Sequence, residues 1–232
     1  MGNTVPSLFA AVVGKDPSLP FLTFYDDATG ERTELSGATL ANWVSKTANL
    51  LVDGCGLGPG DVAAVRLPAH WQTAAILLGA WTAGLSVAYG EPTAAGADVE
   101  FASLAVAERD AEIGAAGNAS GVADRYVLGL APMGLPMRGS VPTGWADYVA
   151  EVRQFGDHYP GPVGGEGTGE LIERARALAL PGGRLLVDAD THPDPVQWLV
   201  GPLAAGASIV LSVNSDPEKL AARAAAEQAV PI

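Results

Sequence analysis

The residues best suited to chemistry in this sequence surround the histidine at position 192. His192 stands among Asp188, Asp190 and Asp194, directly after the apolar run 184–187, which we expect to be a buried strand. A histidine and carboxylates at the carboxyl end of a strand could bind a metal ion or transfer protons, and ligands of open α/β sheets bind at that end. The spacing fits no metal-binding pattern. An ordinary acidic loop is therefore the simpler interpretation, with His192 and Asp190 as candidate ligand-binding residues.

A second pair of candidates, His70 and Trp71, follows the apolar run 62–67. This is the equivalent place after a strand in the first half of the chain. A packing or capping role is the simpler interpretation of both residues. A ligand pocket between the two halves of the chain is the alternative.

The glycine-rich segment 161–169 could be a degenerate phosphate site or a connector. An anion site needs backbone N–H groups and usually a cation directed at the charge. The segment has Thr168 as its hydroxyl and Glu166 as its charged residue, with no lysine and no GxxxxGK[ST] pattern. A connector is therefore favoured. Thr168 is expected to cap the helix that follows, and contact with a ligand is its alternative role.

Two further residues give no reactive site. Ser86 follows Gly84, but a nucleophile elbow needs a strand before the serine, and here a helix comes first. Cys55 has no cationic neighbour in the sequence that would lower its pKa. As the single cysteine it cannot form an intramolecular disulfide, so a reducing, cytoplasmic location is expected. No residue is assigned a catalytic or metal-binding role.

The composition fits a globular protein and excludes some partners. Of the 232 residues, 48% are hydrophobic, which is enough to bury a core. The formal charge of −13 argues against nucleic acid and anionic membranes as partners, because phosphates require a basic patch. No apolar run reaches the ~18 residues that a membrane span needs. The N-terminus matches neither a secretory signal nor the myristoylation pattern.

The stretch 62–89 predicts the central element of the fold. It consists of an apolar strand, a helix over 70–83 and a second apolar strand over 85–89. This helix has no polar stripe, so it must be covered on more than one side of a parallel crossover. The remaining pattern predicts helices near 5–13, 36–51, 143–152, 168–179, 195–203 and 216–228, helix formers over 105–123, a hairpin over 21–35, and strands near 97–104, 125–130, 184–187 and 208–213.

Two parts of the chain repeat the same order of elements. Residues 39–89 and 168–213 each give a helix, a glycine turn, a strand, a crossover helix and a strand. AGLSVAY at 83–89 also resembles AGASIVL at 205–211, and duplication is favoured over chance. The fold class is therefore α/β, with two similar lobes of mostly parallel sheet. The predicted division is a first lobe over 1–135, a Pro/Gly-rich connector with one helix over 136–167, and a second lobe over 168–232.

The chain resembles the N-terminal region of the adenylate-forming superfamily, which comprises acyl-CoA synthetases, peptide-synthetase adenylation domains and luciferases. Residues 21–90 carry the resemblance, in which GLGPGD at 56–61 and Leu67-Pro68 match a Gly-x-Gly-x-Gly-Asp turn and a Leu-Pro strand exit. The stretch 184–211 is similar to a later family stretch and places His192 near the family's acyl-pocket histidine, although the Leu-Pro-x-x-His context is absent. The family folds there as two similar αβ lobes, which agrees with the repeat.

The departures from the family fall in its reactive parts. The family's triphosphate loop ends in Pro-Lys-Gly, whereas 161–169 has no lysine, and the sequence ends before the family's adenylate-binding motifs and catalytic lysine. The resemblance therefore implies an acyl-CoA-synthetase-like protein without adenylation activity of its own. It would retain binding of an acyl or nucleotide ligand, such as ATP or AMP, or of a protein partner, and no cofactor is assigned.

Two alternatives remain open. One is an active acyl-activating or acyl-transferring enzyme with an unusual nucleotide site or a partner subunit. The other is a structural homo-oligomer, such as a homodimer, whose copies cover open sheet edges.

Overall fold

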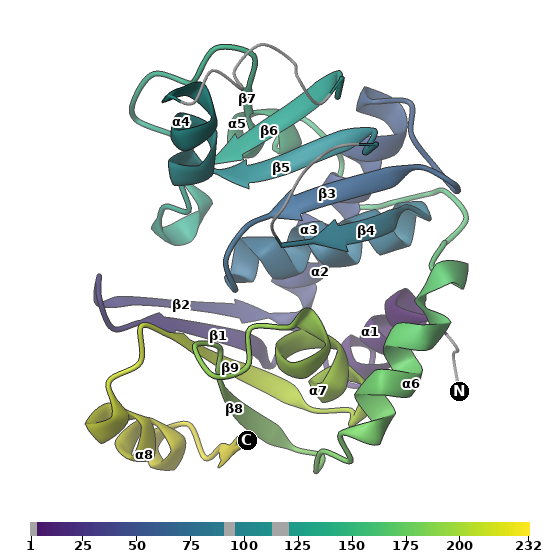
Figure 1. The fold of residues 1–232 in the computed structure, drawn as a ribbon. Coiled ribbons are helices and arrows are strands. Elements are labelled where there is room, and N and C mark those ends of the chain that lie inside the picture. Colours follow the sequence, from purple (N-terminus) through teal and green to yellow (C-terminus); the bar gives the residue numbers. More distant parts are fainter. Residues whose placement is uncertain (1–3, 91–95, 113–120) are drawn as a thin grey trace. The chain divides into compact units, whose positions relative to one another are not determined.

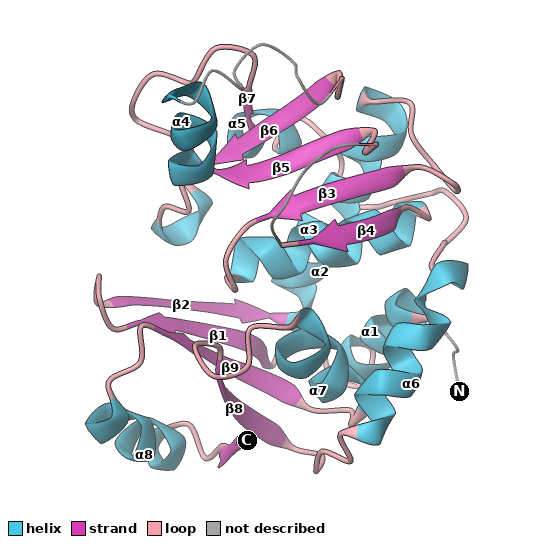
Figure 2. Cartoon of the chain, viewed as in Figure 1, coloured by secondary structure: helices cyan, strands magenta, loops and turns pink. Residues whose placement is uncertain are grey.

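The structure, a computed structural model, describes residues 4–90, 96–112 and 121–232 (Figure 1). The chain divides into two compact units: unit 1 is Met1–Ala41, Ala69–Ala74 and Gly165–Ile232, and unit 2 is Asn42–Pro68 and Ala75–Gly164. Each unit contains one five-stranded sheet (Figure 2). This division differs from the predicted 1–135, 136–167 and 168–232. The physical reason is that the N-terminal hairpin pairs with a strand from the C-terminal end of the chain.

Unit 1 is built on the sheet with strand order β10-β8-β9-β1-β2. Strands β1 and β2 pair antiparallel, as the predicted hairpin, whereas β1–β9, β8–β9 and β8–β10 pair parallel. The elements of this unit are β1 (Pro20–Asp26), β2 (Glu31–Ser36), β8 (Arg184–Asp188), β9 (Ser208–Val213), β10 (Val230–Pro231), α1 (Val5–Val13), α6 (Gly169–Ala177), α7 (Gly201–Ala204) with the helical turn Val196–Val200 before it, and α8 (Pro217–Ala226).

The two faces of the unit 1 sheet differ in composition. Successive side chains of a strand point to opposite faces, so the register gathers buried apolar side chains on one face: Leu22, Phe24, Leu185, Val187, Ile209 and Leu211. On the other face, Ala224 of α8 packs against Leu186 and Val210. Polar side chains, among them Thr23 and Ser212, are also buried there. One face is therefore apolar over β8, β9 and most of β1, with polar residues such as Thr33 and Glu31 toward the β2 edge, and the other face is mixed.

Unit 2 is built on a parallel sheet with strand order β4-β3-β5-β6-β7. Figure 1 shows α4 on one side of this sheet and α2, α3 and α5 on the other. The boundary between the two units falls inside α2 and α3. The elements are β3 (Val62–Arg66), β4 (Ser86–Tyr89), β5 (Val99–Ser103), β6 (Asp124–Leu128), β7 (Ala146–Asp147), α2 (Gly37–Asn49), α3 (Trp71–Ala83), α4 (Leu104–Glu112) and α5 (Tyr148–Val152).

The crossover from β3 through α3 to β4 has the form predicted for 62–89. All thirteen residues of α3 are buried, which explains the missing polar stripe. On one side α3 touches α2 at Gly79, where an added Cβ would lie 2.5 Å from the Cβ of Thr47. Glycine is needed at position 79 because the two helices approach within backbone contact.

Two predicted elements differ in detail from the structure. Helix α5 has five residues and begins at Tyr148, and Asp147 rather than Thr143 caps it, by accepting the N–H groups of Val149 and Ala150. The helix formers over 105–123 give α4 over Leu104–Glu112, while 113–120 lies outside the described residues. The remaining predicted helices and strands are present within a few residues of their expected ends.

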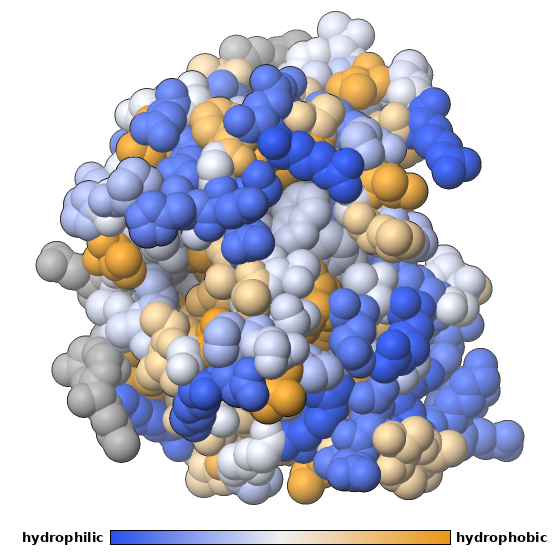
Figure 3. Space-filling view, turned by 180° about the vertical axis from the view of Figure 1, so that it is seen from behind, coloured by the Kyte–Doolittle hydropathy of each residue, from blue (hydrophilic) through white to orange (hydrophobic). Residues whose placement is uncertain are grey.

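The surface of the described residues is mixed in character. On the face shown in Figure 3, hydrophilic residues are interspersed with smaller hydrophobic groups. Large hydrophobic side chains that are exposed include Leu19, Met133, Leu135 and Val163. Within the described ranges, no helix combines the length and the apolar character that crossing a membrane requires.

Candidate functional site

The acidic segment after β8 is a loop whose carboxylates hold the backbone. The carboxylate of Asp190 accepts the N–H of Asn214 at 3.1 Å and the N–H of Ser215 at 2.7 Å. Asn214 has a positive φ of 49°, which is uncommon for a residue other than glycine. Asp190 therefore ties its own loop to the turn that follows β9, and this is a structural task that its sequence position did not indicate.

His192 is half-buried in the same loop and interacts locally. Its Nδ1 lies 2.9 Å from the hydroxyl of Thr191 and 3.3 Å from the carbonyl oxygen of Asp188. Asp194 points elsewhere, accepting the N–H of Val196 and pairing with Arg174 at 2.6 Å. Among the residues that the structure describes, no group of three or more His, Cys, Asp or Glu side chains could hold a metal ion. These contacts of His192, Asp190 and Asp194 thus lie mainly within this loop and the turn that follows β9, and their role in ligand binding stays a prediction.

His70 is a buried, uncharged side chain. It is 3% exposed, and its ring centroid lies 4.4 Å from that of Phe24 in an edge-on contact. Burial lowers its pKa to about 3, so the ring is neutral at ordinary pH. Its Nδ1 accepts the N–H of Gln72 at 3.1 Å, near the start of α3, and its buried Nε2 has no hydrogen-bond partner within the described part of the chain. The expected packing and capping role fits this geometry, and a neutral ring could not attract a phosphate by charge.

Trp71, the partner of His70 in the prediction, is 1% exposed, and the two ring centroids lie 5.6 Å apart. In the described residues, no hydrogen bond connects His70 to His192 or Asp190.

Thr168 uses its hydroxyl within the protein. The hydroxyl accepts the N–H of Val5 at 3.0 Å and donates to the carbonyl oxygen of Gly165. The side chain is buried and forms no capping hydrogen bond with α6, although α6 begins at the next residue. The expected side-chain cap is therefore replaced by a bond that fastens the start of α1 to the glycine-rich segment.

The glycine-rich segment 161–169 is closely packed at its centre. The N–H of Gly164 donates to the carbonyl oxygen of Thr82 at 2.8 Å, and a Cβ at position 164 would lie 2.3 Å from the Cα of Gly84. Gly165 has a φ of +95°, and a Cβ there would lie 2.8 Å from Cδ of Pro6. These two glycines are required by close packing and by a left-handed backbone.

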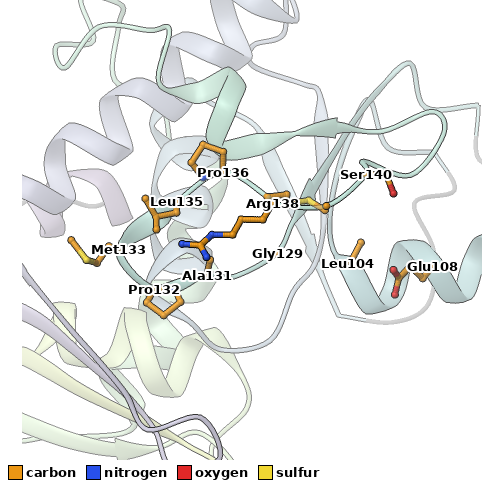
Figure 4. A pocket seen from close by; sticks show the side chains of 12 residues that line it. Leu104, Glu108, Gly129, Ala131, Pro132, Met133, Leu135, Pro136, Arg138 and Ser140 are labelled. Atoms are coloured by element: carbon orange, nitrogen blue, oxygen red, sulfur yellow. The ribbon is translucent and has the colours of Figure 1, made fainter.

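The sequence did not reveal a cavity of about 660 Å³ that is lined mainly by residues 129–140 (Figure 4). This segment was predicted as irregular chain and connector. Its one sequence signal is the mixture of methionines, prolines and an arginine in APMGLPMRG at 131–139. Such a mixture has no period and therefore no predicted structure.

Comparison with known proteins places the chain. No family model matches it. A curated protein of Mycobacterium tuberculosis, described as a TIGR03089 family protein, is 44% identical over 227 residues, which cover 92% of this chain and 90% of that protein. The chain belongs to the TIGR03089 family.

Solved structures show which fold the TIGR03089 chain has. An acyl-CoA synthetase from Brucella canis superposes with a TM-score of 0.74 at 18% identity, covering 96% of this chain and 46% of the synthetase. The N-terminal domain of FACL13 from Mycobacterium tuberculosis superposes with a TM-score of 0.66 at 13% identity, covering 99% of this chain and 62% of that one. The TIGR03089 chain therefore has the α/β fold of the N-terminal part of acyl-CoA synthetases, and it spans about half the length of the Brucella enzyme.

Proposed function

We propose that this TIGR03089 chain is an acyl-CoA-synthetase-like binding protein that does not adenylate carboxylic acids. The observation that carries the proposal is the packing of the segment 161–169, which the sequence resemblance matches to the family's triphosphate loop. The N–H of Gly164 and the hydroxyl of Thr168 both bond to protein groups. A triphosphate would need such donors to be free and directed toward it.

The distribution of cations supports the same conclusion. The segment 161–169 contains no lysine or arginine. Lys46 donates to the carbonyl oxygen of Phe155 at 2.6 Å and pairs with Asp157 at 2.9 Å. Lys219 lies 3.7 Å from Asp27 and 3.8 Å from Asp216. These two of the chain's three lysines are thus engaged with acidic groups of the protein.

The test is an ATP–pyrophosphate exchange assay on the purified chain with a mixture of carboxylic acids. We expect no exchange above the rate of an enzyme-free blank, while an active acyl-CoA synthetase assayed in parallel exchanges readily. Exchange that elutes together with the chain would overturn the proposal. It would instead support the competing proposal of an acyl-activating enzyme with a different nucleotide site.

A further inference from the structure

A ligand-sized cavity lies at the carboxyl ends of two parallel strands in unit 2. Gly129 directly follows β6, and Leu104 directly follows β5 at the start of α4. Together with the loop 129–140 they line a half-open pocket of about 660 Å³ (Figure 4), a volume within the ~300–1,000 Å³ of small-molecule sites. Ligands of open α/β sheets bind beyond the carboxyl ends of the strands. The cavity is therefore in the part of this sheet where a site is expected on general grounds.

The loop that forms the cavity is held in a defined conformation. The N–H of Met137 donates to the Asp147 carboxylate at 2.7 Å, and the Arg153 guanidinium donates to the carbonyl oxygen of Gly134 at 2.9 Å. Leu130 and Met133 have positive φ angles of 51° and 61°. A left-handed backbone at residues other than glycine costs about 1–3 kcal/mol and concentrates at binding sites. The hydrogen bonds of the loop offset this cost, so the cavity is already formed without a ligand.

The lining combines apolar side chains with one uncommitted cation. Leu104, Met133, Leu135 and Met137 supply apolar surface. Arg138 extends along the cavity in Figure 4, and it makes no hydrogen bond or ion pair with any described residue. Arg138 is exposed, and in a chain with a formal charge of −13 an arginine that has no acidic partner among the described residues and lies beside apolar surface attracts an anion.

The negative charge near the cavity limits how many negative charges a ligand can carry. Glu108, on α4, also lines the cavity and has no ion-pair partner among the described residues. Its carboxylate and the overall negative charge oppose any ligand with several negative charges, such as a nucleoside triphosphate. One anionic group can pair with Arg138 while an apolar body covers the methionine and leucine side chains. We propose that this cavity binds a small apolar monoanion, such as a monocarboxylate.

The assignment rests on the proposed binding role of the chain, and its test is independent of ATP. The probe is 8-anilinonaphthalene-1-sulfonate, an apolar monoanion whose fluorescence reports binding. We expect saturable binding that 2-naphthoate displaces and that neutral 2-naphthamide displaces at least tenfold more weakly. Equal displacement by the acid and the amide would overturn the assignment.

Substitutions then locate the site. Arg138→Met keeps an apolar stem and removes the charge, and it should weaken probe binding about 10- to 100-fold, as expected for a lost charged hydrogen bond. Arg176→Met is the matched control, because Arg176 is exposed on α6 in unit 1, and binding should not change. Unchanged binding by the Arg138 variant would overturn the assignment.

A second pair of variants avoids any question of folding. Met133 is 76% exposed, so replacing it should not disturb the core. Met133→Glu should weaken probe binding and Met133→Lys should strengthen it, each by several fold. Two effects of the same sign would indicate a general hydrophobic contact and would contradict the site. An ATP–pyrophosphate exchange result does not bear on any of these measurements, so failure of one proposal can be told from failure of the other.

Discussion

Each of the two sheets carries a charged network on one face, and the two networks differ in how far they are removed from water. In unit 2, the side chain of Glu100 in β5 is fully buried and accepts bonds from Arg66 at 2.7 Å and Arg125 at 2.9 Å. In unit 1, Glu227 accepts bonds from Arg184 at 2.7 Å and Arg32 at 3.1 Å, and the Arg32 side chain is 47% exposed. Carboxylate–guanidinium pairs are thus buried in the unit 2 sheet and partly exposed to solvent in the unit 1 sheet.

The remaining contacts reinforce this difference. The network of unit 2 continues from Arg66 to Asp110 on α4 at 2.6 Å, and the Arg125 guanidinium lies 4.0 Å from the Trp145 ring centre. Few of these groups could turn to water if a partner were lost, because burial leaves no solvent to replace it. We therefore expect the free energy of unfolding to fall strongly when a charged side chain of the unit 2 network is removed. In the unit 1 network, we expect it to depend on pH.

The largest expected difference between the two networks comes from removing the central charge of the buried network. Glu100→Gln should lower the free energy of unfolding by about 3–5 kcal/mol, because it leaves buried guanidinium charge without compensation. Urea denaturation measures the loss. Glu34→Gln is the matched control, since the Glu34–Arg32 pair is partly exposed and is expected to contribute about 0–1 kcal/mol. Equal losses in the two variants would show that burial does not distinguish the networks.

The acid response of the unit 1 network is the next test. Burial alone would raise the pKa of Glu227, but hydrogen bonds from Tyr25, Arg184 and Arg32 outweigh it and lower the pKa to about 2, from an ordinary 4.5. A lowered carboxyl pKa stabilises the folded protein above pH 4.5, and this contribution is lost as the pH falls from 4.5 toward 2. The shift corresponds to about 3 kcal/mol.

Glu227→Gln should therefore reduce the dependence of unfolding free energy on pH in that window, and the remaining slope comes from carboxyl groups such as Asp27 and Asp110, whose pKa values are also lowered. Chemical denaturation at several pH values measures it. A variant that keeps the wild-type slope between pH 4.5 and 2 would contradict the role of Glu227.

The third test concerns the pH dependence of stability that comes from His70, which belongs to neither network. Its expected effect on the free energy of unfolding is the smallest of the three. Because the folded pKa is about 3 and the ordinary value is 6.5, the unfolded chain binds the proton first as the pH falls. Stability should then fall below pH 6.5, by about 2 kcal/mol between pH 7 and 5. In His70→Phe, which keeps a ring beside Phe24, this slope should disappear while the slope below pH 4.5 remains. A slope that persists between pH 6.5 and 5 would assign it to another group.

Local patterns in the sequence were sufficient to predict the helices and strands, but they were insufficient to predict which strands pair with each other. The apolar run of α3 and the repeated order of elements around β3 and β8 indicated parallel crossovers, and both pairs β3–β4 and β8–β9 are parallel. The pairing of β1 with β9 joins Leu22 to Ile209 across most of the chain. No local signal encodes such a pairing, so the two compact units combine segments that the predicted division keeps apart.

The site predictions show the same limit. Asp190 and Thr168 were singled out as candidate ligand-binding residues, and that role stays a prediction. Their hydrogen-bond partners, the N–H groups of Asn214, Ser215 and Val5, are known only from the fold. Glu100 and Arg125 lie in strands predicted from their apolar neighbours, and nothing in the order of residues indicated that the two charges would meet. The cavity was missed because its walls come from a segment without periodicity.

The contact between Gly164 and Gly84 gives the glycine-rich segment an unusual property. Chains this rich in glycine are ordinarily the sites where proteases cut, because an extended backbone can enter the enzyme's cleft. Here two residues without side chains meet backbone to backbone, and the Gly164 amide is bonded to Thr82. The composition of this segment suggests a flexible linker, but its backbone is held in place by close packing. A side chain at Gly164 or Gly84 would disrupt this packing.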